Sequence, residues 1–520
     1  MISLISLARF SAWVSRSLTN SGTYRFLNVI EIYGNKLPDP VTLFVIIALI
    51  ILVASALAAM TNVSAINPST GENIEAVNLL SGEGLVQILT EMVSNFANFP
   101  PLGLVLVVMI GVGLAEATEL IQALMRRALS STPPKFVIPA IIFIGMLGNM
   151  AGDAAFIVLP PIAAMLLMGL GLNPLAGLIV AYASVAGGFA ANLIVNMLDV
   201  LVAGFTEVGA QIMDPNYAAN PAMNWYFLIV SFLVLVIVAT IVTNKFTIPR
   251  LGKYDGKVEQ MEELTDDEKR GLRWAGWSAL IYVAILLVLT LPSNGILRNP
   301  ETGSLVSGSP LMTGLVPIIM FLFFIPALFY GLGAKTIKND KDVATMLGKA
   351  MVTMGPYIIL AFVAAQMIAY FNWSNLGPII AIKGAEFLQS VGLTGIGLLV
   401  GFVLISALIN LLVANSSAKW AILAPVFIPM FMILGYDPAF TQMAYRIGDS
   451  ITNPITPMLP YFAILLSFAK VYQSKIGIGT LMSALLPYSI FFAMAWIILL
   501  VIWFFLGLPL GPDGPIFLPS

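Results

Sequence analysis

The chain has 520 residues, of which 59% are hydrophobic and only 10% are charged, and its net charge is −2. Soluble domains carry about 25% charged residues, so this composition indicates a chain that lies mostly in lipid. The absence of Cys and His excludes disulfides, thiolate chemistry, histidine-ligated metals and histidine proton relays. Any proton coupling must therefore use Asp or Glu.

The first segment, 1–38, is expected to be a basic amphipathic helix on the cytoplasmic face of the membrane. Arg9 and Arg16 interrupt its apolar residues, and no small-residue cleavage site follows a hydrophobic core, so it does not resemble a signal peptide. A disordered tail is the alternative interpretation of the same residues.

Nine stretches of the chain are apolar enough to cross a bilayer, which takes about 20 residues per helix. Lys and Arg cluster between them, and the positive-inside rule places these clusters in the cytoplasm. The predicted spans are about 39–60, 99–123, 174–200, 224–244, 274–292, 311–332, 351–371, 439–463 and 480–506. Two further stretches, about 136–170 and 393–432, must begin and end on the same side, so each is predicted to be a re-entrant hairpin.

The two halves of the chain resemble each other at an offset of 264 residues, and by the charge argument they cross the membrane in opposite directions. An inverted repeat of this kind is typical of secondary transporters. The matched pairs are Phe156 and Trp420, Pro161 and Pro425, Gly171 and Gly435, Asn173 and Asp437, and Pro174 and Pro438. The predicted organisation is an N-terminal segment (1–38), a scaffold helix (39–60), a first repeat (99–244), a cytoplasmic linker (245–273), scaffold helices (274–349), a second repeat (351–506) and a C-terminal tail (507–520).

Four stretches interrupt the apolar pattern at membrane depth: two hairpin tips and two helix breaks. Such backbone is tolerated only where it is buried or lines a wet cavity. Its free N–H and C=O groups, with side-chain oxygens such as those of Asn192, Asn415 and Asn453, suit a carboxylate and a sodium ion. The tips are 145–156 and 410–421, and the breaks are 183–193 and 448–457.

Five charged residues remain at membrane depth: Asp153, Asp199, Lys419, Arg446 and Asp449. A charge there costs at least about 2.5–3.5 kcal/mol, so such residues are functional by default. Arg446 and Asp449 are three residues apart and are expected to share a helix face and pair. One interpretation is that the pair only holds the break in shape. The other is that Arg446 binds a substrate carboxylate while Asp449 carries a proton or helps to bind a cation, and both hold if protonation of Asp449 releases Arg446.

The other residues of this kind allow several interpretations. Asp199 is protonated, binds a cation, pairs with the other repeat, or lies in water near the outer mouth. Asp153 caps a half-helix or takes part in coupling. Lys419 faces water at the tip, and Trp420 is a packed aromatic or a platform for a ligand ring.

The stretches GDAAFIVLPPIAAMLL, AGGFAANL and ANSSAKWAILAPVFIPMFMILGYDPAFTQMAYRIGDSITNPITPMLPYF resemble the aminobenzoyl-glutamate transporter (AbgT) family, over essentially the whole chain. The resemblance implies nine transmembrane helices, two re-entrant hairpins, and a homodimer whose mobile transport domains move like elevators against a scaffold. It also implies uptake of p-aminobenzoyl-glutamate or export of sulfonamide antimetabolites. The family positions that match here are Asp199, Ser417, Trp420, Pro438, Arg446, Asp449 and Pro457.

We therefore expect an all-α polytopic protein of the bacterial inner membrane, an elevator-like secondary transporter and not an enzyme. It would have no cofactor, sodium or a proton as coupling ion, a small-molecule substrate, the lipid bilayer and a second copy as partners, and no nucleic acid. The expected substrate-binding residues are Asn415, Ser417, Trp420, Pro438, Arg446 and Pro457. The expected coupling residues are Asp153, Asn192, Asp199, Asp449 and Asn453, with any sodium held at the broken helices.

Three alternatives are weaker. A sodium-coupled dicarboxylate symporter would be expected to carry paired Ser-Asn-Thr motifs at both hairpin tips, and only residues 415–417 come close. An intramembrane aspartyl protease would use Asp199 and Asp449, but no protease motif surrounds Asp199. A passive channel does not explain hairpins and charges at membrane depth.

Overall fold

The structure is a computed structural model that describes residues 40–66, 71–148, 154–252, 254, 264–305, 309–392 and 394–518. Within these ranges the chain is mostly helical, and ten helices are long and apolar enough to cross a membrane. This confirms the prediction of an all-α polytopic membrane protein. The ten include both arms of the second predicted hairpin and omit the first broken helix, whose pieces are shorter. The N-terminal segment 1–38 and Asp153 lie outside the described residues.

Almost all of the regular elements are helices. The first half contains α3 (Pro40–Met60), β1 (Ser64–Ile66), β2 (Asn73–Glu75), α4 (Gly82–Ala97), α5 (Pro100–Ala117), α6 (Leu120–Ser130), η1 (Pro134–Phe136), α7 (Val137–Gly148), α8 (Ala154–Gly169), α9 (Pro174–Gly187), η3 (Gly188–Ala190), α10 (Met197–Ala210), α11 (Trp225–Val242), η4 (Thr243–Thr247) and α12 (Ile248–Leu251). The second half contains α13 (Asp266–Thr290), α14 (Pro310–Thr313), α15 (Leu315–Ala334), α16 (Asp340–Thr353), α17 (Gly355–Trp373), α18 (Leu376–Ser390), α19 (Gly395–Leu412), α20 (Ser416–Ile433), α21 (Pro438–Thr452), η5 (Asn453–Ile455), α22 (Pro460–Tyr472) and α23 (Ile478–Leu506).

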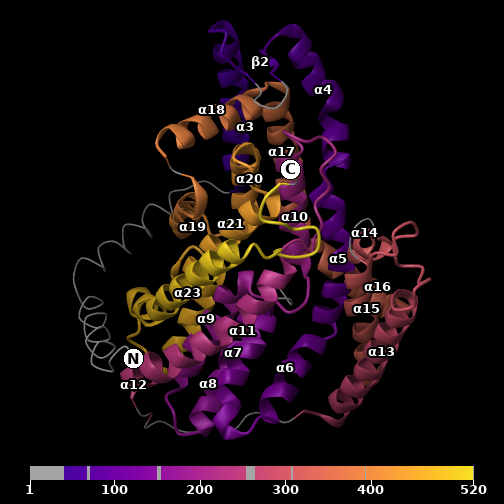
Figure 1. Cartoon of the computed structure of the whole chain (residues 1–520). Coiled ribbons are helices and arrows are strands. Elements are labelled where there is room, and N and C mark those ends of the chain that lie inside the picture. Colours follow the sequence, from indigo (N-terminus) through magenta and orange to yellow (C-terminus); the bar gives the residue numbers. More distant parts are fainter. Residues whose placement is uncertain are drawn as a thin grey trace.

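Two groups of helices can be followed in Figure 1. Helices α15 and α16 pack against α5 along one flank of the molecule, and α13 packs on the outside of α15. Helices α9, α11 and α23 lie on the other side of α5, and α19, α20 and α21 lie next to them. At one end, α3, α4 and α17 stand together with the antiparallel β1–β2 hairpin.

The same order of elements occurs twice: two apolar helices, a broken helix and a long helix. In the first half these are α7, α8, α9 with α10, and α11; in the second they are α19, α20, α21 with α22, and α23. Local details match as well. Gly171 (φ +73) and Gly435 (φ +88) take the left-handed conformation, and Asn173 and Asp437 cap the helices that follow. The opposite membrane orientation of the two halves and the elevator motion stay predictions.

Both helix breaks lie later in the chain than expected. The first covers 188–196, after which Asn196 starts α10 and carries the helix on to Ala210. The expected end of this span at residue 200 is therefore wrong, because an N-cap at Asn196 begins a new helix where the hydrophobic pattern indicated an end. The second break covers 453–459, and α22 begins with Pro460 at its first position.

The core of the molecule is built on α9 and α21. All residues of α9 and all but the last residue of α21 are buried, even though α21 carries several polar side chains. Close packing around them depends on glycine, since a Cβ at Gly448 would clash with the Val403 carbonyl oxygen of α19. Helices α3 and α13 by contrast expose large apolar side chains, as expected of surfaces that face lipid or a partner chain.

Candidate functional site

The first helix break ends in a capping box that fixes the position of Asp199. Asn196 Oδ1 accepts hydrogen bonds from the N–H groups of Leu198 (2.9 Å) and Asp199 (3.2 Å). In return, Asp199 Oδ2 accepts a hydrogen bond from the Asn196 N–H at 2.7 Å. This reciprocal pattern satisfies N–H groups that a helix start would otherwise leave free. Asp199 is fully buried, so the interpretation of an aspartate in water near the outer mouth is wrong.

Arg446 of α21 connects the two sides of the first break. Its Nη1 lies 2.6 Å from Asp199 Oδ1, and its Nη2 donates a hydrogen bond to the Phe189 carbonyl oxygen at 3.1 Å. Phe189 lies at the start of the break and Asp199 follows its end. Arg446 and Asp199 are 3% and 0% exposed, so this pair joins the two halves of the chain in a buried setting. Among the alternatives considered for Asp199, the structure therefore agrees with an ion pair to a residue of the second repeat, Arg446.

The expected ion pair between Arg446 and Asp449 is not formed. Asp449 Oδ1 instead lies 2.5 Å from the Lys419 Nζ atom of α20. Spacing along one helix permits a pair of this kind, but neighbouring helices supply closer opposite charges for both residues. The prediction failed because i,i+3 spacing contains no information about which other elements pack against the same face.

Lys419 is the centre of a second buried network. Its Nζ donates hydrogen bonds to Asn410 Oδ1 and Asp449 Oδ1, both at 2.5 Å, and lies 3.5 Å from the Val413 carbonyl oxygen. Asn410 Nδ2 lies within 2.7–2.9 Å of three further oxygens, those of the Asp449 carbonyl, Thr452 Oγ1 and Asn453 Oδ1. Lys419 is only 1% exposed, so the expectation that it faces water at the hairpin tip is wrong.

Trp420 lies inside the molecule between α10 and α21. Its ring stacks on Tyr445 with a centroid separation of 4.3 Å, and its Nε1 donates to Thr206 Oγ1 at 2.9 Å. Thr206 in turn donates to Gln442 at 2.5 Å. Because Trp420 is fully buried, the structure places it as a packed aromatic with a satisfied indole N–H. Use as a platform for a ligand ring requires Tyr445 to move.

The remaining predicted site residues are spread over both breaks and the second tip. Asn415 caps α20 at the exposed tip, and Ser417 Oγ donates to Asn415 Oδ1 at 2.8 Å. Pro438 is the first residue of α21, two turns before Arg446, and Pro457 lies within the second break. Asn453 is buried in the Asn410 network, and Asn192 is buried in the first break.

Buried polar atoms without a hydrogen-bond partner concentrate at the first break. Six of the fifteen buried side-chain atoms that make no hydrogen bond among the described residues belong to Asn192, Asn196, Asp199 and Arg446. Two of the six, Asp199 Oδ1 and Arg446 Nη1, face each other in the ion pair, so four remain without a partner. Both polar atoms of the Asn192 amide and Nε of Arg446 are among them. A buried donor or acceptor without a partner costs about 1–3 kcal/mol. A concentration of such atoms therefore indicates a place where a ligand or water completes the structure.

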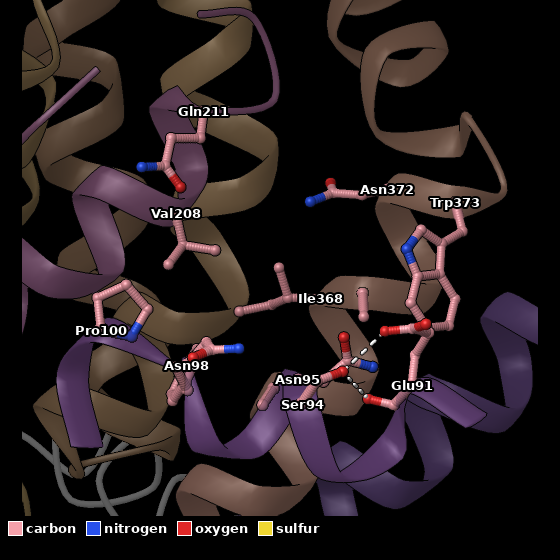
Figure 2. A pocket seen from close by; sticks show the side chains of 13 residues that line it. Glu91, Ser94, Asn95, Asn98, Pro100, Val208, Gln211, Ile368, Asn372 and Trp373 are labelled. Carbon is pink, nitrogen blue, oxygen red and sulfur yellow. Dashed lines mark hydrogen bonds between the residues drawn. The ribbon is translucent and has the colours of Figure 1, made fainter. Parts of the chain in front are cut away.

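A separate pocket of about 420 Å³ lies between α4, the start of α5, the end of α10 and α17 (Figure 2). Amide side chains and aromatic rings surround it, and Ser94 donates a hydrogen bond to Glu91 at its edge. None of the residues predicted from the sequence lines this pocket, and the buried ion pairs are not part of its wall. Helix α10 connects the two features. Its first turn holds Asp199 and its last turn holds Val208, about 14 Å further along the axis.

Sequence reasoning missed several residues of the site. Asn410 was not singled out, although a lone amide in the apolar run of α19 is the usual sign of a polar partner in the bundle. The pairing of Asn196 with Asp199 is visible as a capping-box spacing. Nothing in the sequence indicates the pocket, because its walls come from helices far apart in the chain. Within the described residues, no group of three or more Asp, Glu, His or Cys is placed to hold a metal ion.

Comparison with known proteins shows a match over almost the whole chain. Residues 25–518 match a model described as the AbgT putative transporter family. The p-aminobenzoyl-glutamate transport protein of Escherichia coli (strain K12) is 38% identical over 484 residues, covering 93% of this chain and 95% of that protein.

Two solved structures are similar to the whole fold. The YdaH transporter of Alcanivorax borkumensis has 39% identity and a TM-score of 0.88, covering 91% of this chain and 100% of that chain. MtrF of Neisseria gonorrhoeae, which is described as illuminating a class of antimetabolite efflux pumps, has 43% identity and a TM-score of 0.88, covering 94% and 100%.

Proposed function

This chain belongs to the AbgT family, and we propose that it is an ion-coupled secondary transporter of p-aminobenzoyl-glutamate or sulfonamide-type antimetabolites in the bacterial inner membrane. The resemblance predicted from its second-half motif is confirmed, and the chain is a multi-pass membrane transporter, not an enzyme. Similar proteins described as a p-aminobenzoyl-glutamate transport protein and an antimetabolite efflux pump support the two substrate classes.

The observation that carries the proposal is the set of unpartnered polar atoms at the first break. p-Aminobenzoyl-glutamate offers two carboxylates and one amide. Arg446 Nε is a free buried donor for a carboxylate, and charge-assisted hydrogen bonds of this kind are the strong ones. The Asn192 amide has a free donor and a free acceptor, the complement of the substrate amide. Substrate binding would therefore satisfy groups that the protein alone leaves unpaired.

The pocket of Figure 2 suits the approach to this site. Its size lies in the range of pockets that hold small organic molecules. Trp373 offers an aromatic face and Glu91 offers an acceptor for an aromatic amine. Both substrate classes contain an aminophenyl ring, so this lining supports a first, weaker contact before the substrate moves along α10.

The finer features of the mechanism are part of the proposal. Asp449 is the first candidate for the coupling group and Asp199 the second, with sodium or a proton as the ion. The scaffold would consist of α3 and the helices between residues 274 and 332, and their exposed apolar faces are suited to contact a second copy in a homodimer. The transport domain would move against them with the two hairpins and broken helices.

A flux assay in proteoliposomes tests the proposal. Labelled p-aminobenzoyl-glutamate is supplied while a proton gradient and a sodium gradient are imposed separately. We expect one of the gradients to drive uptake or export, and Arg446→Ala to abolish flux because the buried guanidinium is the main carboxylate donor. Normal flux in Arg446→Ala would show that Arg446 does not bind the substrate carboxylate.

The matched control is Arg298→Ala. Arg298 donates only to backbone carbonyls of its own loop and of the end of α13, so its removal should leave flux intact. The alternative is a sodium-coupled dicarboxylate symporter. It is distinguished by measuring whether simple dicarboxylates, which lack the ring, compete with labelled p-aminobenzoyl-glutamate for transport. Equal competition by glutarate would favour that alternative over the proposed substrate.

A further inference from the structure

The surroundings of the Lys419 ammonium group have the composition of a cation site. The three oxygens around Nζ are a side-chain amide (Asn410), a carboxylate (Asp449) and a backbone carbonyl (Val413), at 2.5, 2.5 and 3.5 Å. They come from α19, from the connection after it and from α21. Hard cations prefer oxygen ligands, at about 2.3–2.6 Å for calcium, an ion similar in size to sodium.

The position in the fold is also that of an ion site. Residues 413–415 break the chain between α19 and α20, and 453–459 break it again beside them. Unwound carbonyls at membrane depth are where transporters of this architecture coordinate sodium or protons. Here the chain's own lysine reaches back from α20 and fills that position.

We infer that the Lys419 ammonium is a tethered cation that occupies an oxygen-lined site at the second hairpin tip, so that a sodium ion binds there only when the ammonium is removed. The inferred site itself does not depend on transport. Its consequence for coupling rests on the proposed function: any sodium that drives the wild-type protein must bind elsewhere, and Asp449 as the coupling group would then carry a proton.

The balance of buried charges indicates that Asp449 needs a cation beside its carboxylate. Asp449 has Lys419 as its ion-pair partner, and the nearby Arg446 is already paired with Asp199. Lys383 and Glu386 of the adjacent α18 pair with each other at the surface. Removing the Lys419 charge therefore leaves one buried carboxylate uncompensated, which is strongly unfavourable. A sodium ion in the vacated space would restore the balance.

Thermal unfolding of the full-length protein in detergent tests this inference. The unfolding temperature is measured in sodium chloride and in choline chloride at equal ionic strength, for wild type and for Lys419→Met, which keeps most of the side-chain volume. We expect wild type to give the same value in both salts. We expect Lys419→Met to be stabilised by sodium by several degrees, with saturation in the millimolar range.

Two further variants serve as controls. Lys419→Arg retains the charge and should stay insensitive to sodium. The double variant Lys419→Met/Asp449→Asn has neither charge and should fold without a response to sodium.

If Lys419→Met folds only in sodium, the inference is supported. If it fails to fold in both salts while the double variant folds, or if it folds and ignores sodium, the inference is wrong. Sodium stabilisation of wild type equal to that of Lys419→Met would also overturn it. None of these results requires substrate flux, so they separate this inference from the proposed function.

Discussion

The two helix breaks occupy equivalent places in the two halves of the chain, yet they satisfy their polar groups in opposite ways. At the second break, Asn410 and Lys419 bind the side chains of Asn453 and Asp449. At the first break, the Asn192 amide has no partner among the described residues, and Arg446 bridges the gap with one nitrogen left free.

This difference indicates that the two breaks have different functions. Broken backbone inside a membrane must be satisfied by protein, water or ligand. The second break satisfies its polar groups with neighbouring side chains, and its Lys419–Asp449 pair is electrically neutral. The first break leaves hydrogen-bonding capacity unused, so it is the one that gains most from a bound substrate. The variants below test whether the two breaks really differ in this way.

The largest effect is expected from Asp449→Asn at the second break. This change leaves the Lys419 ammonium buried without its counter-charge, and breaking a buried pair in this way costs about 3–5 kcal/mol. The unfolding temperature should fall sharply in both sodium and choline salts. The same variant should lose its response to the coupling gradient in the flux assay, because Asp449 is the first candidate for the coupling group.

The control for this prediction is Glu386→Gln in the surface pair with Lys383. That pair is separated by 3.3 Å, and both side chains are more than half exposed. Exposed pairs contribute about 0–1 kcal/mol, so little should change. A similar loss in both variants would show that burial of the Asp449 pair is not the cause.

An intermediate effect is expected from Asn410→Ala. The change removes the amide that connects α19 to Asp449, Thr452 and Asn453, and it leaves the Lys419 ammonium with one oxygen fewer. Loss of a buried hydrogen-bonding group costs about 1–3 kcal/mol. Chemical unfolding in detergent measures the loss, and an unchanged midpoint would contradict the role of Asn410 in holding the second break.

The smallest effect on stability is expected from Asn192→Ala at the first break. The Asn192 side chain makes no hydrogen bond among the described residues, so its removal breaks none and also removes two buried groups without partners, and stability should not fall. Substrate affinity should nevertheless fall about tenfold, since a ligand hydrogen bond is worth roughly 1.5 kcal/mol. Binding of labelled p-aminobenzoyl-glutamate measures the affinity.

The matched control is Ser231→Ala, which removes another buried and unpartnered group, on α11. It should change neither stability nor affinity. If Asn192→Ala and Ser231→Ala bind substrate equally well, the unused hydrogen-bonding capacity of the first break does not serve the substrate.

The sequence by itself determined the class of the protein and the location of its unusual segments. A hydrophobic fraction of 59% with clustered Lys and Arg is sufficient to place spans, because the cost of burying charge in lipid acts on each residue separately. The same argument identified Asp199, Lys419, Arg446 and Asp449 as exceptional. The long motif around Arg446 was sufficient to indicate the family.

Only the tertiary structure decided which of these residues meet. Spacing along α21 favoured a pair between Arg446 and Asp449, but Asp199 and Lys419 approach them from other helices at 2.6 and 2.5 Å. The pairing depends on how α10, α20 and α21 pack, and that packing is set by many small contacts distributed over the whole chain. The bilayer acts on residues one at a time, whereas ion pairs depend on two positions at once, and this is why the sequence located the charges but not their partners.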